Sequence, residues 1–206
     1  MEPPERNEIE APQAAASPGS EAAPAVAPPG ATGDVSFWFD VRVWARDIVI
    51  SVAIAAVVIV FLYQPVKVEG TSMLPWLEDQ ERIFVNKFVY RFGDIQRGDI
   101  VVFRFPLDPS KSYIKRVVGL PGDIVEIKEG VLHVNREMVP EPYVEPRYRD
   151  RSGYPASRVP DGHYFVLGDH RDTSNDSRTW GTVERGFIAG KAVFAYWPIE
   201  RFGVLE

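Results

Sequence analysis

Residues 97–134 read RGDIVVFRFPLDPSKSYIKRVVGLPGDIVEIKEGVLHV, and this stretch decides the fold class. Short runs rich in Val, Ile, Phe and Tyr alternate in it with turn sequences, which are Arg97-Gly98-Asp99, Pro121-Gly122-Asp123 and Glu129-Gly130. β-Branched and aromatic side chains favour strands, whereas Gly, Pro and Asp favour turns. The stretch therefore predicts antiparallel strands joined by short connections.

The same pattern continues outward from this stretch, over residues 66–206. Candidate strands are Arg82–Val89, Asp99–Phe105, Tyr113–Val118, Ile124–Ile127, Val131–Val134, Tyr164–Leu167 and Ala192–Trp197. Only Ser72–Leu77 has a short helix-like pattern. Residues 140–162 hold five Pro and many charges, so we expect a surface excursion there. The body is predicted to be mainly β, a barrel or sandwich of packed antiparallel sheets.

An apolar run precedes this body. From Ile48 to Tyr63 the sequence is IVISVAIAAVVIVFLY, which carries no charge but is shorter than the roughly 20 residues of a usual span. A buried core helix and a cleaved signal peptide are alternatives. Trp44 and Tyr63 at its ends suit a membrane interface, and no A-x-A site follows. We therefore expect a transmembrane anchor over residues 42–65.

Charge patterns place the two sides of this anchor. Arg42 and Arg46 precede the run and Lys67 follows it, which favours a cytoplasmic N-terminus and an outer body. Residues 1–35 contain seven Pro, nine Ala and six acidic residues against one basic residue. Such a segment cannot bury enough apolar surface to offset the entropy of ordering, so residues 1–41 are predicted to be a disordered acidic cytoplasmic tail.

Composition also excludes several kinds of chemistry. The chain has no Cys, which excludes disulfides, thiolate metal sites and a cysteine nucleophile. Outside the acidic tail the body is nearly neutral and has no basic block, so nothing predicts a nucleic-acid partner. We expect no cofactor, no metal and a monomeric chain.

A serine in a tight turn is the first candidate for chemistry. It lies in Gly70-Thr71-Ser72-Met73-Leu74-Pro75, seven residues after the apolar run. A Ser at such a place commonly caps a short helix, and this simple interpretation stays open on local sequence. The segment is not the G-x-S-x-G elbow of α/β-hydrolases.

A lysine in a predicted strand is the second candidate. In residues 113–119, side chains alternate between two faces, and each face carries apolar residues and one long cation, Lys115 or Arg116. Both cations could extend to water. If one is buried and acts as a base, it is Lys115, because burial lowers a lysine pKa whereas Arg stays protonated.

The third candidate is residues 168–178, GDHRDTSNDSR, called here the 168–178 box. A solvated turn would explain its polar character, and an EF-hand does not fit because the Gly at position six and the terminal Glu are missing. As a wall of a catalytic site, it could pair Asp176 with Arg178 or Arg116 and place Ser174 against a lysine.

Taken together and in this order, these segments resemble the bacterial type I signal peptidases, or leader peptidases, over residues 48–206. Ser72-Met73 is similar to the family's Ser-Met motif, and Lys115 matches its Lys-Arg-Val-x-Gly motif. The 168–178 box is similar to its Gly-Asp-x-Arg-Asp-x-Ser-x-Asp-Ser-Arg motif. Residues 97–101 match another core strand of the family.

The resemblance implies roles for individual residues. Ser72 would be the nucleophile, Lys115 the general base and Ser174 the hydroxyl that orients the lysine. Asp176 and Arg178 fall on a structural ion pair. The oxyanion hole would use the Ser72 N–H and the backbone at Gly70, where many Gram-negative members carry a second hydroxyl. Walls of the S1 and S3 pockets are expected near Val66, Val68, Met73, Leu77, Tyr113 and Ile114.

The implied protein is a β-rich protease of the signal-peptidase type behind one transmembrane helix, on the outer face of the cytoplasmic membrane. It would cut exported preproteins after small-x-small sites, typically Ala-x-Ala, so its partners would be signal peptides and the bilayer. His170 departs from the Asn that is common at its position. Three alternatives remain: His170 as the base with Asp169 or Asp172, a membrane-tethered binding module, and a Ser–Lys self-cleaving repressor.

Overall fold

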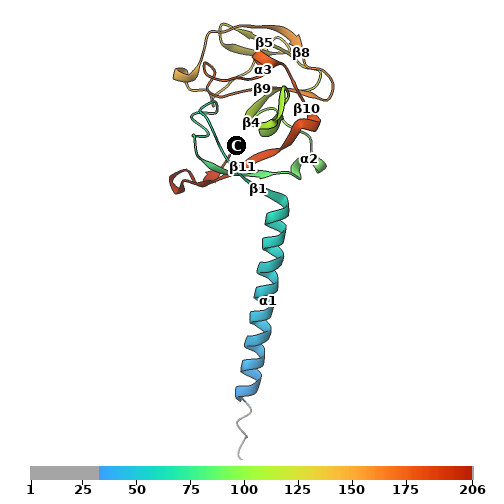
Figure 1. The fold of residues 1–206 in the computed structure, drawn as a ribbon, viewed down its shortest axis with the longest axis vertical. Helices are drawn as coiled ribbons and strands as arrows, with labels where there is room; N and C mark the ends of the chain where they lie inside the picture. The colour runs from blue at the N-terminus through green and yellow to red at the C-terminus, as the bar shows by residue number, and fades with distance from the viewer. Residues whose placement is uncertain (1–32, 206) are drawn as a thin grey trace, which may run out of the picture. The chain divides into compact units, whose positions relative to one another are not determined.

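The computed structural model describes residues 33–205, with the side chains of all of these except residues 33–40 and 60. The chain forms two units, Met1–Ile48 and Val49–Glu206. Helix α1 (Gly33–Leu62) begins in the first unit and ends in the second, where strand β1 (Tyr63–Lys67) follows directly (Figure 1). All the candidate site residues belong to the second unit.

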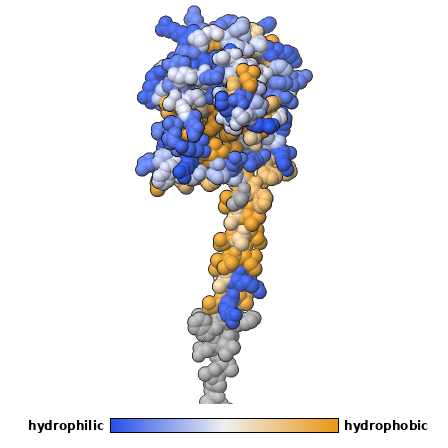
Figure 2. All heavy atoms as spheres, in the orientation of Figure 1, coloured by the Kyte–Doolittle hydropathy of each residue, from blue (hydrophilic) through white to orange (hydrophobic). Residues whose placement is uncertain are grey.

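Residues 48–59 of α1 are apolar apart from Ser51, and their side chains are exposed, with Val49 at 66% and Val52 at 62% (Figure 2). By length and hydropathy, no helix within the described residues meets the requirements of a membrane-crossing segment. The predicted boundaries also differ from the helix. It starts at Gly33, inside the predicted tail of 1–41, and it ends at Leu62, before residue 65. Residues 1–32 of that tail lie outside the described residues.

The larger of two sheets has eight antiparallel strands. Its order is β1–β2–β11–β3–β4–β9–β10, with β12 paired to β11. The remaining bounds in this sheet are β2 (Arg82–Asn86), β3 (Ile100–Phe105), β4 (Asp108–Gly119), β9 (His163–Leu167), β10 (Val183–Glu184), β11 (Ile188–Trp197) and β12 (Gly203–Val204). The prediction of a mainly antiparallel β fold is confirmed.

The smaller sheet has four antiparallel strands in the order β7–β6–β5–β8. They are β5 (Ile124–Lys128), β6 (Val131–Val134), β7 (Glu137–Met138) and β8 (Tyr154–Arg158). Strand β8 corrects the predicted surface excursion at 140–162, because it pairs with β5. Val144 and Val159 of the same segment are buried, at 3% and 1% exposure. This part of the chain therefore contributes to the core.

The described helices after α1 are all short. They are α2 (Val89–Phe92), α3 (Ser177–Trp180), η1 (Pro146–Tyr148), η2 (Arg185–Phe187) and η3 (Ile199–Arg201). The strand predicted to reach Val89 ends at Asn86 instead. The Asn86 side-chain oxygen accepts the N–H groups of Phe88 and Val89 at 2.9 and 3.0 Å. This local turn competes with further strand pairing.

Strand β4 is buried on both sides in its second half. Val117 packs in one apolar cluster with Phe103, and Val118 packs in another with Phe165. Lys115 and Arg116, which precede them, are only 4% and 2% exposed. Cations are seldom buried this deeply unless they are paired or used in chemistry. The fold thus sets two cations at the centre of its main sheet.

Candidate active site

Ser72 lies in a turn after β1 that is anchored on both sides. On one side, Met73 and Leu77 insert into the core at 2% and 0% exposure, and Leu77 N–H donates to the Met73 carbonyl at 2.9 Å. On the other, Gly70 N–H donates to Asp79 Oδ1 at 2.8 Å. Gly70 has φ +94°, a conformation that glycine adopts without strain. These anchors fix the position of the serine between them.

The structure brings Ser72 and Lys115 together from segments 43 residues apart. Lys115 Nζ lies 2.7 Å from Ser72 Oγ and donates a second hydrogen bond to the Ile114 carbonyl at 3.0 Å. Among the described helices, none is capped by Ser72. The interpretation of Ser72 as a helix cap and that of Lys115 as a surface cation are both wrong.

Burial changes the acidity of this lysine. Removal from water disfavours the charged amine and lowers the pKa of Lys115 to about 8, while the negative charges of Asp176 and Asp169 partly oppose the shift. A pKa near 8 leaves a neutral fraction of roughly a tenth at pH 7. Lys115 can therefore take a proton from the serine beside it.

Backbone donors near Ser72 determine where an oxyanion could be held. In the part of the chain that the structure describes, no hydrogen bond occupies the Ser72 N–H. The N–H of Gly70 is already bonded to Asp79. Of the two positions predicted for the oxyanion hole, only Ser72 offers a free N–H.

The 168–178 box packs against this turn. His170 N–H donates to the Ser72 carbonyl, and Gly168 lies so close that a Cβ built on it would overlap the Ser72 carbonyl oxygen and Ser174 Oγ. Gly168 is thus required for the close approach. Ser174 Oγ is buried and has no hydrogen-bond partner within the described residues, so the structure shows no hydrogen bond between it and Lys115.

The carboxylate of Asp176 organises the box from inside. It accepts Gly168 N–H at 3.1 Å and caps α3, and it pairs with Arg178 at 2.8 Å. Arg178 also bonds Asp150 at 2.7 Å and the Arg171 carbonyl. Of the two partners considered for Asp176, the structure shows Arg178.

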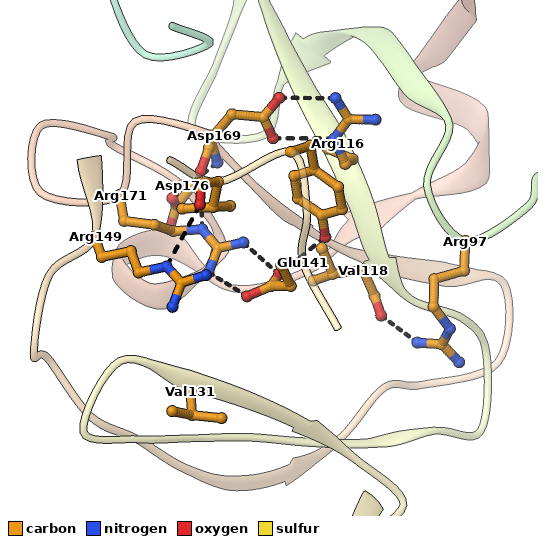
Figure 3. A network of polar contacts seen from close by, with 12 residues as sticks. Arg97, Arg116, Val118, Val131, Glu141, Arg149, Asp169, Arg171 and Asp176 are labelled. Carbon is orange, nitrogen blue, oxygen red and sulfur yellow. Dashed lines mark hydrogen bonds and ion pairs between the residues drawn. The ribbon is translucent and has the colours of Figure 1, made fainter. Parts of the chain in front are cut away.

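Two further buried ion pairs tie the box to the rest of the body (Figure 3). Arg116 bonds both carboxylate oxygens of Asp169, at 3.0 and 2.8 Å. Arg171 faces Glu141, with one contact of 2.8 Å. Burial raises the pKa of Asp169, and the adjacent Arg116 opposes that shift. Such two-point pairs fix geometry as well as charge.

His170 does not contact the serine hydroxyl. Its Nδ1 lies 3.1 Å from the Thr71 carbonyl and its Nε2 lies 2.9 Å from Asp172 Oδ1. Within the described residues, the side-chain hydrogen bond to Ser72 Oγ comes from Lys115. The alternative in which His170 is the base therefore lacks the contact that it needs.

A pocket of about 630 Å³ opens in front of the pair. Its lining includes five of the six predicted wall residues: Val66, Val68, Met73, Tyr113 and Ile114. The sixth, Leu77, is fully buried in the core beneath Met73 and does not line the pocket. The volume lies in the range of ordinary ligand sites.

Comparisons with known proteins show which family the chain belongs to. A family model described as "Signal peptidase, peptidase S26" matches residues 41–197. Signal peptidase I of Bacillus licheniformis is 38% identical over 164 residues, covering 75% of this chain and 88% of that protein. Signal peptidase IB of Staphylococcus aureus (strain Mu50) is 37% identical over 175 residues, covering 77% and 91%. The chain belongs to the S26 signal peptidase family.

A crystal structure of signal peptidase I from Enterococcus faecalis V583 matches with a TM-score of 0.43 and 32% identity, over 48% of this chain and 97% of that one. Membership of the S26 family makes the chain a serine endopeptidase of the signal peptidase I type.

Three residues of the candidate site were not predicted from the sequence. Val102, Thr173 and Asn175 line the pocket. Val102 is opposite Ile114 in the β3–β4 register, so the alternation of two adjacent strands could have placed both on one face. Thr173 and Asn175 flank Ser174 in the box, and only their position beside that residue marked them.

Proposed function

We propose that this chain removes N-terminal signal peptides from exported preproteins by acyl transfer, with Ser72 as nucleophile and Lys115 as general base. The 2.7 Å contact between the serine hydroxyl and a buried lysine amine carries the proposal. The low pKa of Lys115 supports it, because a base with a pKa near the working pH is the most effective.

The neutral Lys115 amine accepts the Ser72 proton as Oγ attacks the carbonyl carbon of the scissile peptide. When the tetrahedral intermediate collapses, the C–N bond breaks and Lys115 returns its proton to the leaving amine, which is the new N-terminus of the mature protein. The same amine then deprotonates a water molecule. Attack of that water on the ester releases the signal peptide with a free carboxyl group and restores Ser72.

The Ser72 N–H stabilises the oxyanion in both tetrahedral intermediates. Because Asp79 occupies the Gly70 N–H, Gly70 contributes backbone shape and no donor. Oxyanion donors act through fixed dipoles at the place where charge develops, and losing one costs roughly 10²–10³ in kcat. Catalysis by an oxyanion hole with a single backbone donor depends strongly on the orientation of that N–H group.

The pocket supports small residues at the cleavage site. Val66, Val68 and Ile114 are apolar wall residues, and Tyr113 adds an aromatic wall. Short apolar side chains such as Ala can pack against these apolar walls. We propose small-x-small sites, typically Ala-x-Ala, in signal peptides as the substrate.

We also propose that α1 holds the enzyme at the cytoplasmic membrane as a single pass, with a cytoplasmic N-terminus and the catalytic body outside. The exposed apolar side chains of α1 after Asp47 support contact with lipid. Confinement near emerging cleavage sites would raise the effective substrate concentration. Alkaline extraction of membranes should leave the chain in the pellet, and release into the supernatant would count against a span.

Cleavage of an Ala-x-Ala preprotein in detergent tests the mechanism. Ser72→Ala, Lys115→Ala and Lys115→Arg should all fall to background, the last because a guanidinium stays protonated. The wild-type rate should fall about tenfold per pH unit below about 8, as Lys115 takes up a proton. A wild-type chain that binds the preprotein without cutting it would instead indicate a binding module.

A further inference from the structure

His170 holds two consecutive carbonyl groups of the nucleophile turn. Its ring Nδ1 lies 3.1 Å from the Thr71 carbonyl oxygen, and its backbone N–H donates to the Ser72 carbonyl at 3.1 Å. The other described hydrogen bond to the Thr71 carbonyl is local, from Leu74 N–H at 3.2 Å. The box thus reaches the turn from about a hundred residues away at the peptide that joins Thr71 to Ser72.

That peptide carries the only free oxyanion donor described above. In a planar trans peptide, the C=O and the N–H point in opposite directions. Whatever fixes the direction of the Thr71 carbonyl therefore fixes the direction of the Ser72 N–H. The His170 ring pulls the carbonyl toward the box, so the N–H points away from the box.

The ring is itself held in place. Nε2 lies 2.9 Å from Asp172 Oδ1, and Tyr148 packs edge-on against the imidazole with ring centroids 4.4 Å apart. The His170 side chain is only 15% exposed. Since the Thr71 carbonyl can only accept, Nδ1 is the donor of this hydrogen bond, and the contact of Nε2 with Asp172 fixes the other side of the ring. The donor that faces Thr71 is thereby kept in one orientation.

We propose that His170 is a positioning residue of the oxyanion hole, which aims the Ser72 N–H by fixing the Thr71–Ser72 peptide. The inference rests on the proposed acyl-transfer function. It assigns His170 no proton transfer with the substrate. Since an oxyanion donor acts in the transition state, the loss of its aim should lower kcat and leave KM unchanged.

Steady-state cleavage of an Ala-x-Ala peptide by the full chain in detergent tests the role. His170→Phe keeps the packing against Tyr148 and removes the donor, so kcat should fall roughly 10- to 100-fold with KM within about twofold. The acid limb should stay near pH 8, because Lys115 is unchanged. His170→Asn, with an amide N–H to offer to Thr71, should recover most of kcat. A structural role alone would not produce this rescue.

His163 provides a matched control. Its Nδ1 also lies 3.1 Å from a carbonyl oxygen, that of Asp161, but this contact is local and remote from Ser72. His163→Phe should leave kcat unchanged. If His170→Phe is folded, as judged by its melting temperature, and keeps wild-type kcat, the positioning role is rejected. If the wild type itself fails to cut the peptide, the proposed function fails as well.

A peptide aldehyde gives a readout without turnover. Ser72 Oγ adds to its carbonyl carbon, the C=O π bond becomes a C–O⁻ or C–OH group, and the serine proton passes to Lys115 or to that oxygen. The affinity of the aldehyde should fall in His170→Phe by about the same factor as kcat. The matching peptide alcohol cannot form this adduct and should bind both proteins equally. An equal loss for aldehyde and alcohol would reject the inference.

Discussion

Lys115 and Arg116 are neighbours on β4 and are almost equally buried, yet they belong to regions of opposite character. On the catalytic side, Lys115 hydrogen-bonds to a hydroxyl and a carbonyl, which are neutral groups, and its amine lies 5.4 Å from the centre of the neutral Tyr113 ring. On the side of the 168–178 box, Arg116 contacts both oxygens of the Asp169 carboxylate. The same depth of burial therefore lowers the pKa of the lysine and leaves the arginine in a fixed ion pair.

The difference extends beyond the two side chains. Arg171 is paired with Glu141, and Arg178 with Asp176 and Asp150, so the cations of the box are compensated by carboxylates. The paired region also acts on the unpaired one, because the charges of Asp176 and Asp169 raise the pKa of Lys115 and limit the effect of burial. The ion pairs hold the 168–178 box in a fixed conformation. The amine of Lys115, beside it, has no such ion pair and can gain or lose a proton.

Breaking a pair on the box side should have the largest effect on stability. Arg116→Leu leaves the Asp169 carboxylate buried without a partner, which should lower the free energy of unfolding by about 3–5 kcal/mol. Replacing both residues by Leu should recover most of this loss, because no charge then stays buried alone. Urea unfolding followed by tryptophan fluorescence measures both variants.

The exposed pair of Lys128 and Glu126 is the control for this experiment. It also joins a cation to a carboxylate, at 2.9 Å, but the lysine side chain is 62% exposed. Lys128→Leu should change the free energy of unfolding by less than about 1 kcal/mol. If Arg116→Leu lowers the free energy of unfolding no more than Lys128→Leu does, the buried ion pairs do not stabilise the 168–178 box.

Sequence patterns predicted the central strands well and the edge strands poorly. The core strands alternate or run apolar, and seven predicted strands correspond to β2, β3, β4, β5, β6, β9 and β11. Strands β7, β10 and β12, of two residues each, were missed, and so were the longer strands β1 and β8. Both lie at sheet edges, each contains a Pro, and most of their side chains are exposed, so they read as loop.

The site was predictable as a set of residues but not as a geometry. Locally, Ser72 resembled a helix cap and Lys115 a surface cation; only their resemblance to a family motif joined them. The contacts between the box and the turn at Thr71 depend on the tertiary fold, and no local pattern encodes them. Leu77 was placed in the pocket wall through the resemblance to the family, but its position one helical turn after Met73 directs its side chain into the core.

On the catalytic side, removing the cation should have a smaller effect on stability and the opposite sign. Burial lowers the pKa of Lys115 from 10.5 to about 8, so the charged amine destabilises the fold by up to about 3 kcal/mol. Lys115→Met should therefore raise the free energy of unfolding at pH 7, less what the lost hydrogen bonds to Ser72 and Ile114 contributed. The variant should be inactive and more stable.

The pH dependence identifies the cause of that gain. Below about pH 8 the lysine is protonated in both the folded and the unfolded chain, so the full penalty is present. Between about 8 and 10.5 the unfolded chain binds more protons, and wild-type stability rises with pH relative to Lys115→Met. Above 10.5 the advantage of the variant should vanish. Urea unfolding of both proteins from pH 6 to 11 measures this difference, and an advantage that is independent of pH would mean that packing, and not the uncompensated charge, distinguishes the catalytic side of β4 from the box.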